Sequence, residues 1–128
     1  MFYSSVTKYL LFISVTFVVG QPTATKVFAA TPFETRCGWF SNPTPSNAFL
    51  SDRHGEWIIG LQGGHQAKGD WPNFKQQWMV TNYGGYGYGC ACLRVRANHQ
   101  NRKVLEIKNS YAKPLAACRK DRSLKKPN

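Results

Sequence analysis

The segment NYGGYGYGCACLRVR, residues 82–96, organises the rest of this sequence and contains two of its four cysteines. In a β-strand, successive side chains point to opposite faces of the sheet. One face would carry Tyr86, Tyr88, Cys90, Cys92, Arg94 and Arg96. The other would carry Gly85, Gly87, Gly89, Ala91, Leu93 and Val95, which are small at first and larger at the end. The segment therefore predicts a central strand with one end open to a bulky partner and the other in a core.

The first 29 residues have the features of a secretory signal peptide. Lys8 precedes an apolar run over residues 9–19, whereas a membrane-spanning helix needs about 20 apolar residues. Small or tolerated residues before the junction predict cleavage after Ala29, which leaves residues 30–128 as a single secreted β-rich domain. The alternative is an uncleaved membrane anchor. We therefore expect export to the periplasm or the extracellular medium, and no membrane span in the mature form.

The chain is strongly basic, with 17 lysine and arginine residues against 6 aspartate and glutamate residues. No carboxylate lies between Asp70 and Glu106, and a second basic cluster, interrupted by Asp121, occupies residues 119–126. A field of this sign favours an anionic glycan, a lipid headgroup or another polyanion as partner. The alternative interpretation is a basic monomer without a dedicated partner.

The remaining sequence predicts a mainly β fold. We expect a small disulfide-stapled antiparallel sheet or a compact barrel-like domain, with a short C-terminal helix opened by Pro114. One hairpin would join residues 48–50 to residues 56–62. A second would bring a strand at residues 103–109, through Leu105 and Ile107, against the apolar face of the central strand, and residues 77–81 would form a further strand.

The cysteines are expected to staple both chain ends to the central strand. Cys90 and Cys92 would have Cα atoms about 6.6 Å apart at the rise of a strand, near the upper limit for a disulfide bond. Each is therefore expected to pair outward, one with Cys37 and one with Cys118. Of the two remaining connectivities, Cys37–Cys90 with Cys92–Cys118 is preferred. All four cysteines in disulfides would fit an oxidising compartment.

Three histidines, His54, His65 and His99, lie in predicted turns or loops and are the candidate acid–base groups. Two imidazoles that exchange protons at a phosphodiester would make a small nuclease-like hydrolase. A metal site built on Cys90 and Cys92 with a histidine is a second alternative, but the C-x-x-C spacing typical of zinc sites is absent. No catalytic residue, metal or cofactor is predicted.

Aromatic residues allow two interpretations. In one, Trp39 or Trp57 fills the core and lies across the groove at Gly87 and Gly89. In the other, aromatic rings form a stacking platform for sugars or bases beside the arginines. The residues concerned are Trp39, Trp57, Trp71, Trp78, Tyr83, Tyr86 and Tyr88.

Several short motifs give the chain a family resemblance. They are RCGWF (36–40), NPTP (42–45), LSDRHGEW (50–57), QGGH (62–65), TNYGGYGYGCACL (81–93) and PLAACRKD (114–121). Over about residues 34–124 the chain resembles a family of small secreted bacterial proteins catalogued as a domain of unknown function. The resemblance implies a bacterial envelope or secreted location, and no activity, catalytic residue or cofactor.

Tyr86, Tyr88, Arg94 and Arg96 share one face of the central strand and form the predicted binding surface, where tyrosine rings stack on a ligand and arginines hold anions. The expected function is a non-catalytic binding module for an anionic or glycan component of the bacterial envelope. The alternatives are the nuclease-like hydrolase and an inhibitor of a secreted enzyme.

Overall fold

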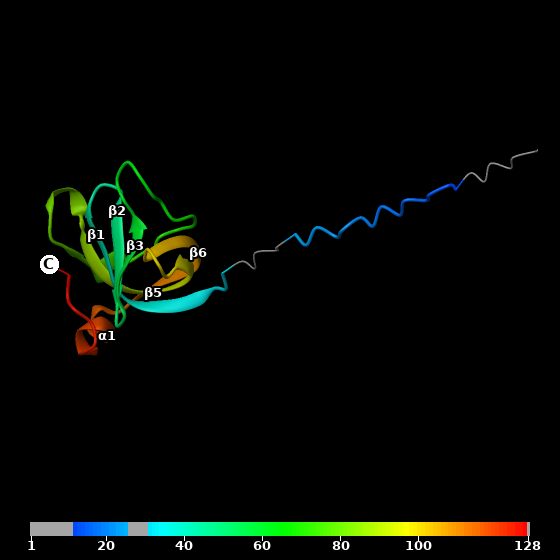
Figure 1. Ribbon diagram of the computed structural model, residues 1–128. Helices are drawn as coiled ribbons and strands as arrows, with labels where there is room; N and C mark the ends of the chain where they lie inside the picture. Colours follow the sequence, from blue (N-terminus) through cyan, green and yellow to red (C-terminus); the bar gives the residue numbers. More distant parts are fainter. Residues whose placement is uncertain (1–11, 26–30, 128) are drawn as a thin grey trace, which may run out of the picture.

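The computed structural model describes residues 12–25 and 31–127. Residues 12–25 form no strand or helix, are exposed, and run away from the folded domain (Figure 1). The predicted signal peptide falls partly on residues 1–11 and 26–29, and its cleavage point at Ala29 lies outside the described residues. Of the helices described, none has the length and apolarity to cross a membrane.

The folded part is mainly β, as predicted, with a short C-terminal helix (Figure 1). Two 3-10 helices, Lys75–Gln77 and Tyr83–Gly85, flank the shortest strand. The other elements are β1 (Glu34–Thr44), β2 (Asn47–Asp52), β3 (Gly55–Gly60), β4 (Trp78–Val80), β5 (Gly87–Asn98), β6 (Lys103–Lys113) and α1 (Leu115–Lys120). The predicted hairpin of residues 48–62, the strand within residues 77–81 and the helix after Pro114 are therefore confirmed.

Five of the strands close into a small barrel. The strand order is β1-β2-β3-β6-β5-β4, and β1 also pairs with β5. Because β5 returns beside β1 after the β1–β2–β3 meander, the connection is a Greek key, as in other five-stranded barrels. β3 and β6 meet in parallel, at Ile58 and Lys103, so the sheet is mixed rather than purely antiparallel.

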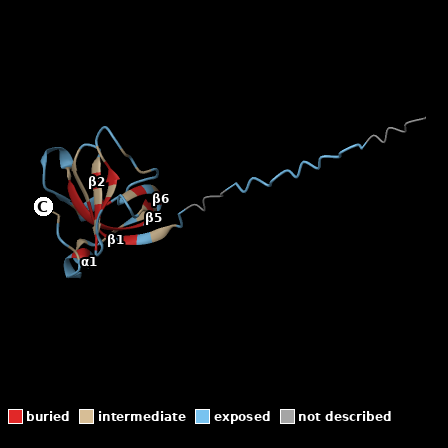
Figure 2. Cartoon of the chain, viewed as in Figure 1, coloured by how far each residue is buried: buried red, intermediate tan, exposed pale blue. Residues whose placement is uncertain are grey.

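The segment around β5 is the centre of the barrel, as its alternation predicts. β5 pairs with β1 along one side, and with β4 and then β6 along the other. Its inward residues Ala91, Leu93 and Val95 are fully buried in the main core. Figure 2 shows this strand among the most buried parts of the domain.

The groove at the glycines is filled by the segment around β4. A Cβ atom added to Gly89 would collide with the ring of Phe74, and one added to Gly87 would collide with the backbone carbonyl of Met79. The prediction of an aromatic ring over the glycines is therefore confirmed for Gly89, but the ring is neither Trp39 nor Trp57. Trp39 lies in the outward row of β1, and Trp57 lies in the inward row of β3 at the other end of the barrel.

The second hairpin contains two register shifts that change which residues face the core. They lie between Arg94 and Val95 and between Arg96 and Ala97 on β5. As a result Ile107 lies opposite Val95 and is buried, whereas Leu105 is 42 % exposed. The expectation that Leu105 faces the core is thus wrong, because each extra residue in the partner strand turns the following side chain to the other face.

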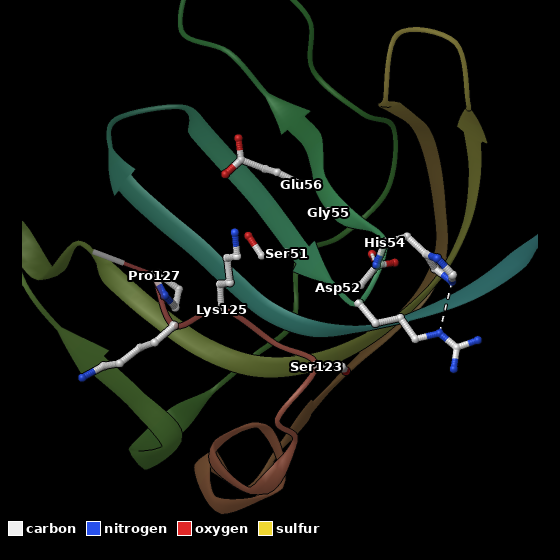
Figure 3. A pocket seen from close by; sticks show the side chains of 10 residues that line it. Ser51, Asp52, His54, Gly55, Glu56, Ser123, Lys125 and Pro127 are labelled. Carbon is white, nitrogen blue, oxygen red and sulfur yellow. Dashed lines mark hydrogen bonds between the residues drawn. The ribbon is translucent and has the colours of Figure 1, made fainter.

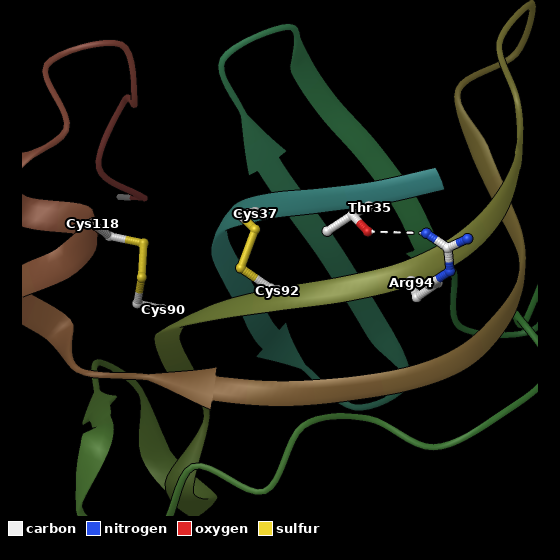
Figure 4. The surroundings of a disulfide bond; sticks show 6 residues. All are labelled: Thr35, Cys37, Cys90, Cys92, Arg94 and Cys118. Carbon is white, nitrogen blue, oxygen red and sulfur yellow. Dashed lines mark hydrogen bonds between the residues drawn. A yellow bond between two sulfur atoms is a disulfide. The ribbon is translucent and has the colours of Figure 1, made fainter. Parts of the chain in front are cut away.

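Both disulfide bonds use the central strand, but the preferred connectivity is wrong. The bonds are Cys37–Cys92 and Cys90–Cys118, and no cysteine in the described residues is free (Figure 4). The antiparallel register places Cys37 directly opposite Cys92, with their Cα atoms 4.1 Å apart. The register between β1 and β5 therefore decides the pairing and leaves Cys90 to bond with Cys118 of α1.

A second apolar cluster lies on the outer side of the barrel. Trp39, Tyr88 and the Cys90–Cys118 disulfide are buried there under Leu115 and Leu124. Helix α1 and the segment after it thus cover part of the outward face of β5.

Candidate anion-binding face

The four predicted binding residues do not form one surface. Tyr88 is 4 % exposed because the C-terminal segment covers it, and Lys126 Nζ lies 5.9 Å from its ring centroid. Tyr86 is half-buried just before β5 begins. Arg94 and Arg96 remain together on the outward face of the strand, in a part that α1 leaves uncovered. The structure therefore brings the two arginines together and separates them from the tyrosines.

Strand β6 adds two lysines to this outward face: Lys108 near Arg96, since both lie over the ring of Phe33, and Lys113 further along the strand. Across the two strands, Lys113 lies opposite Cys90, Tyr111 opposite Cys92, Asn109 opposite Arg94, and Glu106 opposite Arg96. Residues directly opposite in an antiparallel pair have Cβ atoms about 5 Å apart, so these side chains are neighbours. We call the group Arg94, Arg96, Lys108, Tyr111 and Lys113 the basic face.

Arg96 is largely engaged in structural contacts. Its Nη1 lies 3.2 Å from Glu106 Oε2, and its guanidinium lies 4.2 Å from the ring centroid of Phe33. Lys108 Nζ is 5.2 Å from the same ring. Among the described atoms, Arg96 Nε is buried without a hydrogen-bond partner, and a buried unpaired donor is costly. The contact with Arg96 Nη1 also means that Glu106, the carboxylate beside the basic face, is already paired.

Arg94 is the more available arginine. It is exposed, and its Nη1 donates a long hydrogen bond of 3.4 Å to Thr35 Oγ1 (Figure 4). A guanidinium has five N–H donors, so most of them remain for a ligand. An anion at this position would therefore meet an exposed guanidinium with several N–H donors available.

Tyr111 supplies the aromatic surface of this face. It is 55 % exposed and lies across from Cys92, beside the Cys37–Cys92 disulfide. Sequence reasoning missed Tyr111, Lys108 and Lys113. The two-residue spacing of Tyr111 and Lys113 is a signal that could have identified them, but the predicted strand ended at residue 109.

The histidines do not converge on one site. His65 Nε2 lies 2.7 Å from the carbonyl oxygen of Val104. His99 Nε2 lies 3.0 Å from Glu34 Oε1, and His54 accepts a hydrogen bond from Arg53 Nε. In the described ranges no three His, Cys, Asp or Glu side chains are grouped to hold a metal ion.

One end of the barrel is closed by an ion network, which we call the ionic end. Arg36 and Asp52 are both buried, and Arg36 Nη1 lies 2.6 Å from Asp52 Oδ2. Arg36 Nε lies 2.9 Å from Glu34 Oε1, and its guanidinium stacks 3.5 Å from the centroid of Trp57. The rings of His99 and Trp57 meet edge to face, with their centroids 5.1 Å apart. Sequence reasoning missed this network because its members come from four separate segments.

Next to the ionic end, the β2–β3 turn and the C-terminal segment enclose a groove of about 630 Å³ (Figure 3). Asp52 and Glu56 line it together with Lys125 and Lys126, so its charge is mixed. Beside this groove, two hydrogen bonds from Ser123 lower the pKa of the Asp121 carboxyl. Because two carboxylates line this groove, it is a poorer anion site than the basic face.

Comparison with known proteins gives a family and no relative of known activity. Neither the curated proteins nor the solved structures include a match to this chain. The family described as "Protein of unknown function (DUF4087)" matches residues 31–125, which include every element of the barrel. The chain therefore belongs to the DUF4087 family, and the predicted resemblance to a family of unknown function is confirmed.

Proposed function

We propose that the protein is a non-catalytic binding module for an anionic glycan of the bacterial envelope, and that the basic face holds the glycan. The observation that carries the proposal is that Arg94 and Lys113 hold the outward positions on either side of the exposed Tyr111. Arg96 and Lys108 extend the positive charge along the two strands, and the neighbouring Glu106 is already paired. Charged groups on an open sheet face give weak, rapidly exchanging and salt-sensitive binding. Such binding suits retention on a polymer rather than turnover.

A glycan is favoured over a lipid headgroup by Tyr111. A half-exposed aromatic ring between cations can stack on a sugar ring while the cations meet its carboxylates or phosphates. Both disulfides are formed, which fits an exported protein. The hydrolase alternative has no specific support among the described residues, because the histidines make separate contacts.

The test measures binding to alginate oligosaccharides, which carry carboxylates, and to uncharged dextran at low and physiological salt. We expect salt-sensitive binding to alginate alone. The double variant Arg94→Ser/Lys108→Ser should weaken it about 10-fold, or ~1.4 kcal/mol. The matched control is Arg53→Ser/Lys125→Ser, which also removes one arginine and one lysine, but beside the mixed groove.

Three outcomes would contradict the proposal. Equal losses in the two double variants would mean that diffuse net charge is responsible. Absence of binding at low salt would exclude an anionic glycan partner of this kind. Stronger binding to vesicles of anionic phospholipid than to alginate, with the same loss in the Arg94/Lys108 variant, would assign the face to lipid headgroups.

A further inference from the structure

A second hollow, which we call the aromatic pocket, lies at the end of the barrel opposite the ionic end. Its volume is about 460 Å³, within the range of small-molecule sites. Arg36, Phe40 and Asn42 follow one another along the inward row of β1. Arg36 belongs to the ionic end and the other two line the pocket, so the pocket and the ionic end lie at opposite ends of the barrel. The residues that shape the pocket are Phe40, Asn42, Trp71, Phe74, Lys75 and Trp78.

Four aromatic rings form the floor and walls of the aromatic pocket. The ring centroid of Phe40 lies 5.4 Å from that of Trp71 and 5.5 Å from that of Phe74. Phe74 and Trp78 are 4.8 Å apart. Gly89 makes this cluster possible, because any side chain there would occupy the site of the Phe74 ring.

The cluster is held in place but not fully buried. Trp78 Nε1 donates to the carbonyl oxygen of Gly85 at 2.8 Å, which fixes the orientation of this indole. Trp71 is 37 % exposed and Trp78 is half-buried, so indole surface remains open to solvent. Lys75 has a φ of 48°, a left-handed backbone conformation that costs energy for a residue other than glycine. Such residues are concentrated at binding sites.

Asn42 places a hydrogen-bond acceptor at the wall of the pocket. Its Nδ2 donates to the carbonyl oxygens of Thr44 at 2.8 Å and Asn47 at 2.6 Å, which uses both amide hydrogens and defines the orientation of the amide. No residue of the described part of the chain donates to its Oδ1. The pocket therefore combines aromatic surface with an acceptor in Asn42 and a donor in Lys75.

We propose that the aromatic pocket binds one uncharged sugar ring. A pyranose ring has an apolar C–H face, which can cover an exposed indole, and hydroxyl groups at its edge, which both donate and accept. A proline-rich segment is the other ligand that aromatic grooves commonly take. Proline has no N–H, so it would leave Asn42 Oδ1 without a donor. The mixed donor and acceptor set thus favours the sugar.

This site is separate from the basic face, so the two proposals can fail independently. The probes are the trisaccharides of glucose and of N-acetylglucosamine, followed through tryptophan fluorescence and the indole N–H resonances of Trp71 and Trp78. We expect saturable binding of one of the two with a Kd of about 1 mM. Binding should persist in high salt, unlike that of alginate.

Variants assign the signal to the pocket. Trp71→Ala should weaken trisaccharide binding about 10-fold or more, and Trp71→Phe, which keeps an aromatic face, should weaken it less. Tyr83→Ala is the control, since it removes an exposed ring that belongs to neither the aromatic pocket nor the basic face and should leave trisaccharide binding unchanged. Circular dichroism and unfolding curves establish that each variant is folded before its binding is compared.

The proposal is overturned if neither trisaccharide binds in a saturable way, or if both Trp71 variants bind as tightly as the parent. Saturable binding of a proline decapeptide, with the same loss in Trp71→Ala and no binding of either sugar, would reassign the pocket to proline-rich peptides.

Discussion

The two ends of the barrel are closed by different chemistry. At the ionic end, the guanidinium of Arg36 lies between two carboxylates and the ring of Trp57, and the contacts are made within the protein. At the aromatic pocket, Trp71 and Trp78 pack on Phe40 but keep exposed surface. An end whose charged groups pair with one another contributes to the fold, whereas an end with unused surface and an unused acceptor can bind a ligand.

The largest effect is expected at the ionic end. Asp52→Ala should destabilise the protein by about 3–5 kcal/mol, because it leaves the buried guanidinium of Arg36 without its closest partner. The free energy of unfolding in urea measures this. The double variant Arg36→Met/Asp52→Leu removes both charges and should lie much closer to the parent. If Asp52→Ala cost less than about 1 kcal/mol, the ionic end would be hydrated and the contrast between the two ends would be lost.

An intermediate effect is expected at the other end. Gly89→Ala should destabilise by about 1–3 kcal/mol, because the added methyl group would displace the Phe74 ring. Trisaccharide binding should weaken in the same variant, since Phe74 lines the aromatic pocket. Gly64→Ala is the control, because the nearest atoms to its Cβ would lie at 3.8 and 3.9 Å. Equal unfolding curves for the Gly89 variant and the parent would show that the ring moves aside without cost.

The smallest effect concerns Asp121, in the C-terminal segment near the ionic end. Hydrogen bonds from Ser123 lower the pKa of this carboxyl, so its contribution to stability is present above the ordinary aspartate pKa and is lost as the pH falls through the lowered value. Ser123→Ala should raise the pKa of Asp121 in a carboxyl-detected NMR titration. Ser110→Ala, whose hydroxyl donates to a backbone carbonyl, should leave that titration unchanged. If the pKa of Asp121 were unshifted in the Ser123 variant, the hydrogen bond from the Ser123 backbone N–H alone would account for the lowered pKa.

Much of the barrel could be predicted because it depends on local patterns. The alternation in residues 85–97 places Ala91, Leu93 and Val95 on one face wherever the strand lies, and the turn residues at 53–54 join β2 to β3. The disulfide partners could not be chosen, because the choice depends on the register between β1 and β5. Leu105 was misplaced for a similar reason, since no local pattern marked the register shifts.

The sequence by itself determined a basic, disulfide-bonded, mainly β chain centred on the segment of residues 82–96, with Arg94 and Arg96 on one strand face. Tertiary structure alone decided which surfaces remain open. It buried Tyr88 beneath the C-terminal segment, set Tyr111 on the same sheet face as Arg94, and gathered Trp71 and Trp78 over Phe40. The reason is physical: alternation sets the direction of a side chain, but its neighbours come from strands distant in the chain, and burial depends on those neighbours.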